Sequence, residues 1–177
     1  MPNFYKILMS PAGRMGRRDY LLGLAAFTVA VLVFNFILAR MGNSVWAFLI
    51  SLPFPFIVLH MTYCVYGKRL HDMGRSFWPL TAMICALLLV MIGVMLSFGG
   101  SEYFSEFAQY DSKNPAPPEV AEAIRLEYET RMVAGLPWLT GLMSGIIGLF
   151  TLWLVLSKTE PATNQYGPPA SEGETFT

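Results

Sequence analysis

Residues 20–39 read YLLGLAAFTVAVLVFNFILA, twenty consecutive positions without a charged side chain. A helix needs about 20 predominantly apolar residues to cross the roughly 30 Å of hydrocarbon in a bilayer. Three further uncharged stretches of similar length follow, at 45–66, 77–98 and 136–156. The sequence therefore predicts four membrane spans.

The composition agrees with a membrane protein. Hydrophobic residues make up 54% of the 177 positions and charged residues only 14%, whereas soluble domains carry about 25% charged residues. Because lipid offers no hydrogen-bond partner to the backbone, the spans should be helical. The predicted fold class is an all-α, integral membrane four-helix bundle. Cys64 and Cys85 both fall in apolar stretches, so we expect small buried hydrophobes and no disulfide.

The loop charges predict the orientation of the chain, since Lys and Arg accumulate on the cytoplasmic side. Residues 1–19 carry four of them, residues 67–76 three and residues 157–177 one, against four in the loops 40–44 and 99–135 together. We therefore expect both termini in the cytoplasm. The predicted organisation is a cytoplasmic segment (1–19), a membrane domain (20–156) and a cytoplasmic tail (157–177) whose last ten residues are disordered.

The outer loop 99–135 is the largest segment between spans. Val120, Ile124, Tyr128 and Met132 recur every four residues, which predicts an amphipathic helix that ends near Val133. We expect this helix to pack on the outer end of the bundle, and a partner-docking site is the alternative. The same loop is rich in acidic residues, namely Glu102, Glu106, Asp111, Glu119, Glu122, Glu127 and Glu129.

Two features within the spans concern packing. Pro53 and Pro55 should kink the second span, because proline cannot donate to the helical ladder. Gly141 and Gly145 form a G-x-x-x-G pattern, which lets helices approach closely. We expect this pattern to serve packing within the monomer, with a homo-oligomer through Gly141 and Gly145 as the alternative.

Three polar clusters fall on the predicted cytoplasmic side: GRMGRRDY at 13–20, GKRLHDMGRS at 67–76 and NQYGPP at 164–169. They are distant in sequence, but the four-span topology brings them to one side of the membrane. The first two share the pattern M-G-R-x-x-aromatic-x-L, at 15–22 and 73–80. This similarity indicates either two parallel helical hairpins, as some transporters have, or a common constraint where a chain enters the membrane.

The basic residues of these clusters predict contact with anions. A Lys or Arg beside a span attracts anionic headgroups by about 1 kcal/mol. This attraction is sufficient to explain the presence of Arg17, Arg18 and Lys68. Arginine can also hold phosphate or carboxylate in a bidentate fork. We expect Asp72 to pair with Arg69 or Arg14. The predicted ligand- or headgroup-binding residues are Arg14, Arg17, Arg69, His71, Asp72 and Arg75.

His71 and Asp72 invite a chemical interpretation, but the sequence supports it weakly. Adjacent residues on a helix point about 100° apart, and a catalytic metal normally has three protein ligands. A haem held by His71 and His60 would rest on two histidines alone. We therefore expect no catalytic residue, no metal and no cofactor. The favoured role of the pair is a hydrogen-bonded cap that ties the second loop to the N-terminal cluster.

The motifs GRMGR (13–17), RLHDMGRSFW (69–78) and NQYG (164–167) resemble the bacterial "domain of unknown function 805" membrane family. That family's pattern is G-R-x-x-R, then R-L-H-D-x-G-x-S-x-W, then N-x-Y-G, in this order along the chain. The resemblance implies a small multi-helix protein of the bacterial inner membrane and brings no established activity. Beyond the basic residues, the motif positions are Gly13, Gly74, Trp78, Asn164, Tyr166 and Gly167.

The chain departs from the family pattern in two aromatic positions. Tyr20 stands where the family often has Trp, and Pro79 stands where a second aromatic residue often follows Trp78. The long third loop looks like an elaboration. These departures put an identical ligand or partner in doubt.

Together these features predict a non-catalytic membrane protein whose basic cytoplasmic face binds anionic lipid headgroups or a partner. A small transporter or channel-like subunit is the alternative, suggested by the hairpin repeat and the kinked second span. A membrane enzyme that uses His71 and Asp72 is the third hypothesis. The formal net charge is zero, and we expect no nucleic-acid partner.

Overall fold

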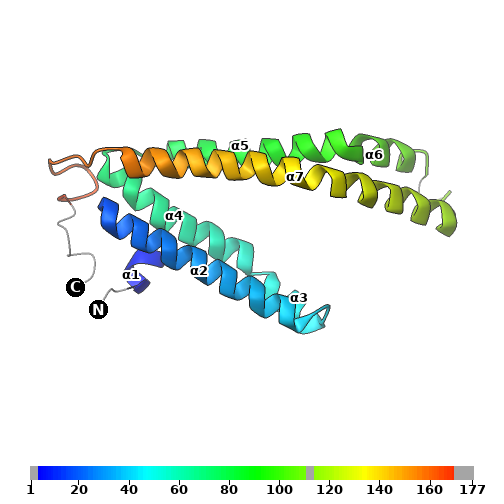
Figure 1. Ribbon diagram of the computed structural model, residues 1–177, viewed down its shortest axis with the longest axis horizontal. Coiled ribbons are helices and arrows are strands. Elements are labelled where there is room, and N and C mark those ends of the chain that lie inside the picture. The colour runs from blue at the N-terminus through cyan, green and yellow to red at the C-terminus, as the bar shows by residue number, and fades with distance from the viewer. Residues whose placement is uncertain (1–3, 111–113, 170–177) are drawn as a thin grey trace. The chain divides into compact units, whose positions relative to one another are not determined.

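The computed structural model describes residues 4–110 and 114–169, and its ribbon is shown in Figure 1. The described residues contain no β-strand, only an isolated bridge between Asn164 and Gly167. The predicted all-α fold class is therefore confirmed. The helices are α1 (Phe4–Leu8), α2 (Arg17–Met41), α3 (Val45–Ser51), α4 (Phe54–Asp72), α5 (Trp78–Met95), the π-helix η1 (Leu96–Gly100), α6 (Ser101–Phe107) and α7 (Pro118–Leu156).

Four helical segments are long and apolar enough to cross a membrane, and they match the four predicted spans. They are Arg17–Met41, Val45–Asp72, Trp78–Phe107 and Pro118–Leu156. The predicted disorder of the last ten residues falls largely outside the described residues, as do Asp111 and Lys113 of the predicted outer loop.

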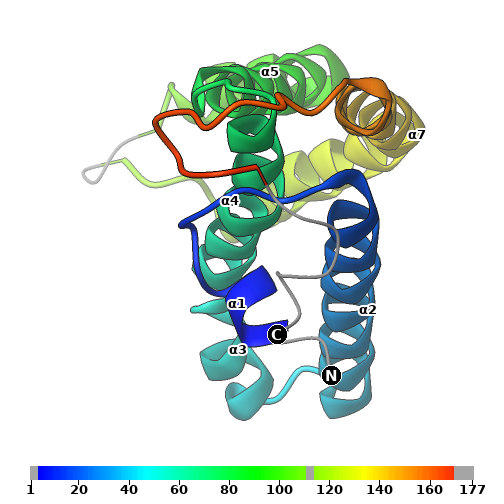
Figure 2. The ribbon, with the colours of Figure 1, turned by 90° about the vertical axis from the view of Figure 1, so that its left-hand side faces the viewer.

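The chain divides into two compact units, one of Met1–Leu80 with Thr151–Thr177 and the other of Thr81–Phe150. In the first unit, α1 lies against both α2 and α4 (Figure 2). Ile7 of α1 is fully buried, and a Cβ added at Gly23 of α2 would lie 2.9 Å from its Cγ2 atom. Gly23 therefore makes room for the N-terminal helix.

The second predicted span differs from a single kinked helix. The chain leaves α3 at Ser51, and α4 begins at Phe54 with Pro53 as its N-cap, so the break lies at the predicted prolines. Helix α4 then continues to Asp72, six residues beyond the predicted end at Tyr66. The predicted loop 67–76 is thus largely helical, because Lys68, Arg69 and Asp72 are buried within the protein instead of ending the helix.

The second unit holds α5 from Thr81 onward, η1, α6 and α7 as far as Phe150. Helix α7 runs as one helix of 39 residues that includes Pro137. The predicted amphipathic helix and the fourth span are therefore continuous. At 1.5 Å per residue α7 is about 58 Å long, well beyond the roughly 30 Å of a bilayer core. Tyr103 of α6 packs on Tyr128 of α7 with ring centroids 4.8 Å apart. The predicted outer loop is thus mainly a helical hairpin.

The glycine pattern of α7 is not used for packing within its unit. A Cβ added at Gly141, Gly145 or Gly148 would meet no atom within 4 Å. Oligomerisation through Gly141 and Gly145 stays a prediction.

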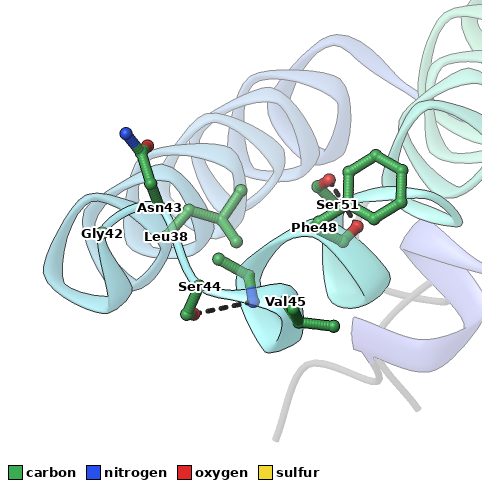
Figure 3. Close-up of a pocket in the computed structure, with 8 residues that line it drawn as sticks. Leu38, Gly42, Asn43, Ser44, Val45, Phe48 and Ser51 are labelled. Atoms are coloured by element: carbon green, nitrogen blue, oxygen red, sulfur yellow. Dashed lines mark hydrogen bonds between the residues drawn. The ribbon is translucent and has the colours of Figure 1, made fainter.

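An open hollow lies where α2 turns into α3 (Figure 3). Gly42, with φ +59°, makes the turn, and Ser44 caps α3 by accepting a hydrogen bond of 3.2 Å from the Ala47 amide. Ser51 donates to the Phe48 carbonyl at 2.8 Å. None of the predicted site residues lines this hollow.

Candidate functional site

The buried polar residues of the described chain gather in one place. All of them lie in the first unit, where the segment after α7 runs beside the C-terminal end of α4 (Figure 2). The three predicted motifs therefore meet. The six buried polar or charged residues are Arg14, Asp19, Lys68, Arg69, His71 and Asp72.

A Schellman motif ends α4 and sets the direction of the chain beyond it. The Gly74 amide donates to the His71 carbonyl at 3.1 Å, and the Arg75 amide donates to the Leu70 carbonyl at 2.8 Å. Gly74 has φ +69°, which favours glycine. A Cβ at this position would also collide with the carboxylate of Glu160. Two structural features therefore favour glycine at position 74: its positive φ and its close contact with Glu160.

Arg69 joins the end of α4 to the end of α7. Its Nε donates to the Leu154 carbonyl at 3.0 Å and its Nη2 to the Ser157 carbonyl at 2.6 Å. Its Nη1 donates to Asp72 Oδ2 at 2.5 Å and to Thr159 Oγ1 at 3.1 Å. The last carbonyls of a helix lack intrahelical partners and carry partial negative charge. Arg69 therefore caps α7 from within the protein.

Arg14 uses all five of its N–H donors. Its Nε donates to Asp72 Oδ1 at 3.4 Å and one Nη2 donor to the Asp72 carbonyl at 3.2 Å. The remaining three donors reach carbonyl oxygens of the segment after α7, those of Glu160, Ala162 and Gly167. A guanidinium has five N–H groups, so this side chain has no donor left for a further ligand.

Asp72 is the carboxylate at the centre of the cluster and is fully buried. Its Oδ1 accepts from Arg14, while its Oδ2 accepts from Arg69 and from the Thr159 hydroxyl at 2.8 Å. Both predicted pairings of Asp72 are therefore present. Removing one partner of a buried ion pair costs about 3–5 kcal/mol, because the other charge stays buried without compensation.

His71 is held between the N-terminal cluster and the tail. Its Nδ1 lies 3.3 Å from the Gly13 carbonyl, and its ring stacks on Tyr166 with centroids 3.7 Å apart and planes 5° apart. Its Nε2 is buried and has no hydrogen-bond partner among residues 4–110 and 114–169. The predicted cap between the second loop and the N-terminal cluster is present. His71 and Asp72 bond different partners and do not form a dyad.

The N-x-Y-G motif is a tight turn that presents Tyr166 to His71. Asn164 and Gly167 exchange backbone hydrogen bonds of 3.2 and 3.0 Å, with Gly167 at φ +120°. The Asn164 side chain accepts from the Tyr166 amide at 2.9 Å and donates to the His71 carbonyl at 3.0 Å. Asn164 therefore shapes the turn and fastens it to α4.

Lys68 has a role that sequence reasoning missed. The sequence predicted that Lys68 attracts lipid headgroups, but this residue is only 1% exposed. Its Nζ donates to the carbonyls of Lys6 and Ile7, at 2.6 and 2.8 Å. These carbonyls lie in the last turn of α1, so Lys68 caps that helix. No sequence signal marks a helix of five residues as the partner of a lysine 60 positions later.

The other basic residues of the motifs face solvent. Arg17 is exposed, and its Nη2 donates to the carbonyls of Leu156 and Ser157 at 3.0 and 2.9 Å. Arg75 is exposed and lies over the ring of Trp153, 5.3 Å from its centroid. Of the six predicted binding residues, four are thus buried together and two are exposed. Trp78 of the middle motif is 77% exposed and stands outside the buried cluster.

Comparisons with known proteins give one match. The model of a family described as "Protein of unknown function (DUF805)" matches residues 8–168, which includes all three motifs. Searches of curated proteins and of solved structures gave no match. Because the matched range covers most of the 177 residues, the chain belongs to the DUF805 family of proteins of unknown function.

Proposed function

We propose that this protein resides in the bacterial inner membrane with both termini in the cytoplasm, and that it binds anionic lipid headgroups without catalysing a reaction. One observation carries the proposal. In residues 4–19, 67–78 and 156–169, every charged residue that is exposed is a cation. These residues, which we call the basic surface, are Lys6, Arg17, Arg18, Arg75 and Lys158.

The buried residues of the cluster do not neutralise the positive charge of the basic surface. The buried cations Arg14, Lys68 and Arg69 are equal in number to the buried carboxylates Asp19 and Asp72 together with the half-buried Glu160. The interior of the cluster is therefore close to neutral, and the exposed cations define its outward potential. Each cation near an anionic membrane surface contributes about 1 kcal/mol of attraction.

The predicted binding residues fall into two groups, one buried and one exposed. Arg14, Arg69 and Asp72 already have internal partners for their donors and acceptors, so they support the site. Arg17 and Arg75 are exposed and carry the charge that a headgroup would meet. His71 belongs with the supporting group, since its ring is covered by Tyr166.

The charges of the second unit support the proposed orientation. Its described residues include two exposed arginines, Arg125 and Arg131, against the five exposed cations of the basic surface. Basic residues favour the cytoplasmic side of a membrane. The acid-rich α6–α7 hairpin therefore fits the opposite side.

A triple substitution tests the proposal. Arg18→Gln, Arg75→Gln and Lys158→Gln remove three exposed cations and leave Arg17, which caps α7. The matched control removes three cations from the other predicted side, with Arg40→Gln, Arg125→Gln and Arg131→Gln. Proteins in nanodiscs of mixed phosphatidylglycerol and phosphatidylcholine are extracted into detergent, and the ratio of the two retained lipids is measured.

The triple variant should lose at least tenfold in its preference for phosphatidylglycerol, since the loss of three cations at about 1 kcal/mol each exceeds the roughly 1.4 kcal/mol that corresponds to tenfold. The control should keep the preference. An unchanged lipid ratio in a folded triple variant would show that the basic surface does not bind headgroups.

A further inference from the structure

We infer that Arg75 is a phosphate fork within the basic surface, recognising the phosphate group of an anionic lipid by paired hydrogen bonds and not by charge alone. This inference rests on the proposed function and assigns the contact to one residue and one chemical group. It follows from how the backbone and the side chain of Arg75 are held, and from which of its donors are unused.

The backbone of Arg75 is fixed by the end of α4. Its amide makes the outer hydrogen bond of the Schellman motif, 2.8 Å from the Leu70 carbonyl. The preceding residue, Gly74, has φ +69° and packs against Glu160. The Cα of Arg75 is therefore attached to the same helix end that carries the buried cluster.

The side chain of Arg75 is held by an aromatic ring. Its guanidinium carbon lies 5.3 Å from the centroid of the Trp153 ring, within the range of a cation–π contact, for which tryptophan is the best partner. Trp153 is in the last turn of α7, and the Leu154 carbonyl beside it accepts from Arg69 at 3.0 Å. Ring and guanidinium thus both rest on the buried network. A side chain ordered before binding loses less entropy on binding.

The N–H donors of Arg75 are unused within the described chain. No acceptor for them and no carboxylate partner is found among residues 4–110 and 114–169. The nearest acid in the tail sequence, Glu160, already accepts from Asn164 at 2.7 Å. By contrast, Arg17 donates to the carbonyls at the end of α7. Arg75 therefore offers an oriented planar edge of donors to an outside acceptor.

The chemistry of that edge favours phosphate. The guanidinium fork matches two oxygens of a phosphate or carboxylate, which an ammonium cannot do. Trp78, three residues further on, is strongly exposed at the start of an apolar helix, the position that tryptophan takes at membrane interfaces. The acceptor at this depth is the phosphate of a lipid headgroup.

Arg40 supplies a matched control. It also lies over an aromatic ring, that of Phe36 at 4.9 Å, but at the far end of α2 and away from the basic surface. Three variants are compared with the unchanged protein: Arg75→Lys, Arg75→Gln and Arg40→Lys. Short-chain phosphatidylglycerol is titrated into each detergent-purified protein, and native mass spectrometry gives the dissociation constant of the first bound lipid.

We expect Arg75→Lys to weaken binding at least threefold, Arg75→Gln at least tenfold, and Arg40→Lys not at all. If Arg75→Lys binds like the unchanged protein while Arg75→Gln loses affinity, the fork is wrong and the proposed electrostatic function stands. If neither Arg75 variant changes affinity, the inference is overturned, and the triple variant above decides the proposed function separately.

Two further measurements keep the test decisive. If Arg75→Lys fails to fold, Trp153→Phe replaces it, because a weaker ring contact should lower affinity while the charge stays. Inorganic phosphate serves as a soluble probe in the same titration. It should compete for the site only weakly. Competition as strong as that of phosphatidylglycerol would show that the fork serves a soluble phosphate and not a lipid.

Discussion

The arginines of two regions of this molecule differ in burial and in their partners. Arg14 and Arg69 are 1% and 0% exposed in their side chains; they share the Asp72 carboxylate, and each also donates to backbone carbonyls of its own. Arg125 and Arg131, on α7, are 63% and 45% exposed, and each pairs with a glutamate one turn away. Exposed pairs of this kind contribute about 0.3–0.5 kcal/mol, whereas breaking a buried pair costs several times more. The number of charged residues in a motif therefore says little about their contribution to stability until their burial is known.

Asp72→Asn should give the largest effect. It removes the carboxylate that both buried guanidinium groups share, and we expect a loss of about 3–5 kcal/mol in the free energy of unfolding. Chemical unfolding in detergent, followed by circular dichroism, measures the change. Glu127→Gln, which removes an exposed partner of Arg131, is the control. Equal losses in the two variants would contradict the difference between the regions.

Gly74→Ala should rank second. Forcing alanine to φ +69° costs about 1–2 kcal/mol, and the added Cβ must also displace the Glu160 carboxylate. Gly141→Ala is the matched control in an open helical position, where alanine should be neutral or stabilising by up to about 1 kcal/mol. Thermal unfolding of both proteins provides the test. A neutral Gly74→Ala would mean that the turn after α4 is not held as described.

Tyr166→Leu should have a smaller effect that is confined to the tail. It removes the ring stacked on His71, a contact worth about 0.5–1.5 kcal/mol beyond its buried area. Limited proteolysis should then cut residues 157–169 faster while leaving the spans intact. Tyr5→Leu, in an exposed position of α1, should leave the cleavage rate unchanged. Equal protection of the tail in Tyr166→Leu would argue against the stack.

Glu129→Gln should give the smallest effect. It breaks the exposed pair with Arg125, so stability should fall by no more than about 0.5 kcal/mol. Because salt screens exposed charges, this difference should vanish when unfolding is repeated at high ionic strength. The loss caused by Asp72→Asn should persist under the same conditions, since its charges are buried. If the stability loss of Glu129→Gln persisted at high salt, the exposed pair would contribute to stability in the same way as the buried pair, and the difference between the two regions would be wrong.

The spans could be predicted because lipid tolerates few charges, and runs such as 20–39 and 136–156 contain none. Their ends could not be predicted in the same way. Helix α4 continues to Asp72, because tertiary partners accept its polar residues. Helix α7 starts at Pro118, because the predicted amphipathic helix joins the fourth span without a break.

The convergence of the three motifs also followed from topology, but the roles of their cations did not. Arg14 and Arg17 are three positions apart in similar sequence surroundings, yet one is buried with all donors used and the other is exposed. The difference arises from backbone carbonyls of the tail, such as that of Ala162. Backbone acceptors are present at every position, so residue types alone do not reveal which of them an arginine will reach.

The dependence of Arg14 on the tail has a consequence for synthesis of the chain. Three of its donors are accepted by the carbonyls of Glu160, Ala162 and Gly167, which the ribosome makes about 150 residues after Arg14 itself. The Arg14 guanidinium therefore cannot complete these hydrogen bonds until the ribosome has made residues 160–167, and it stays hydrated until then. The first unit is therefore completed late, when the segment after α7 binds an arginine made about 150 residues earlier.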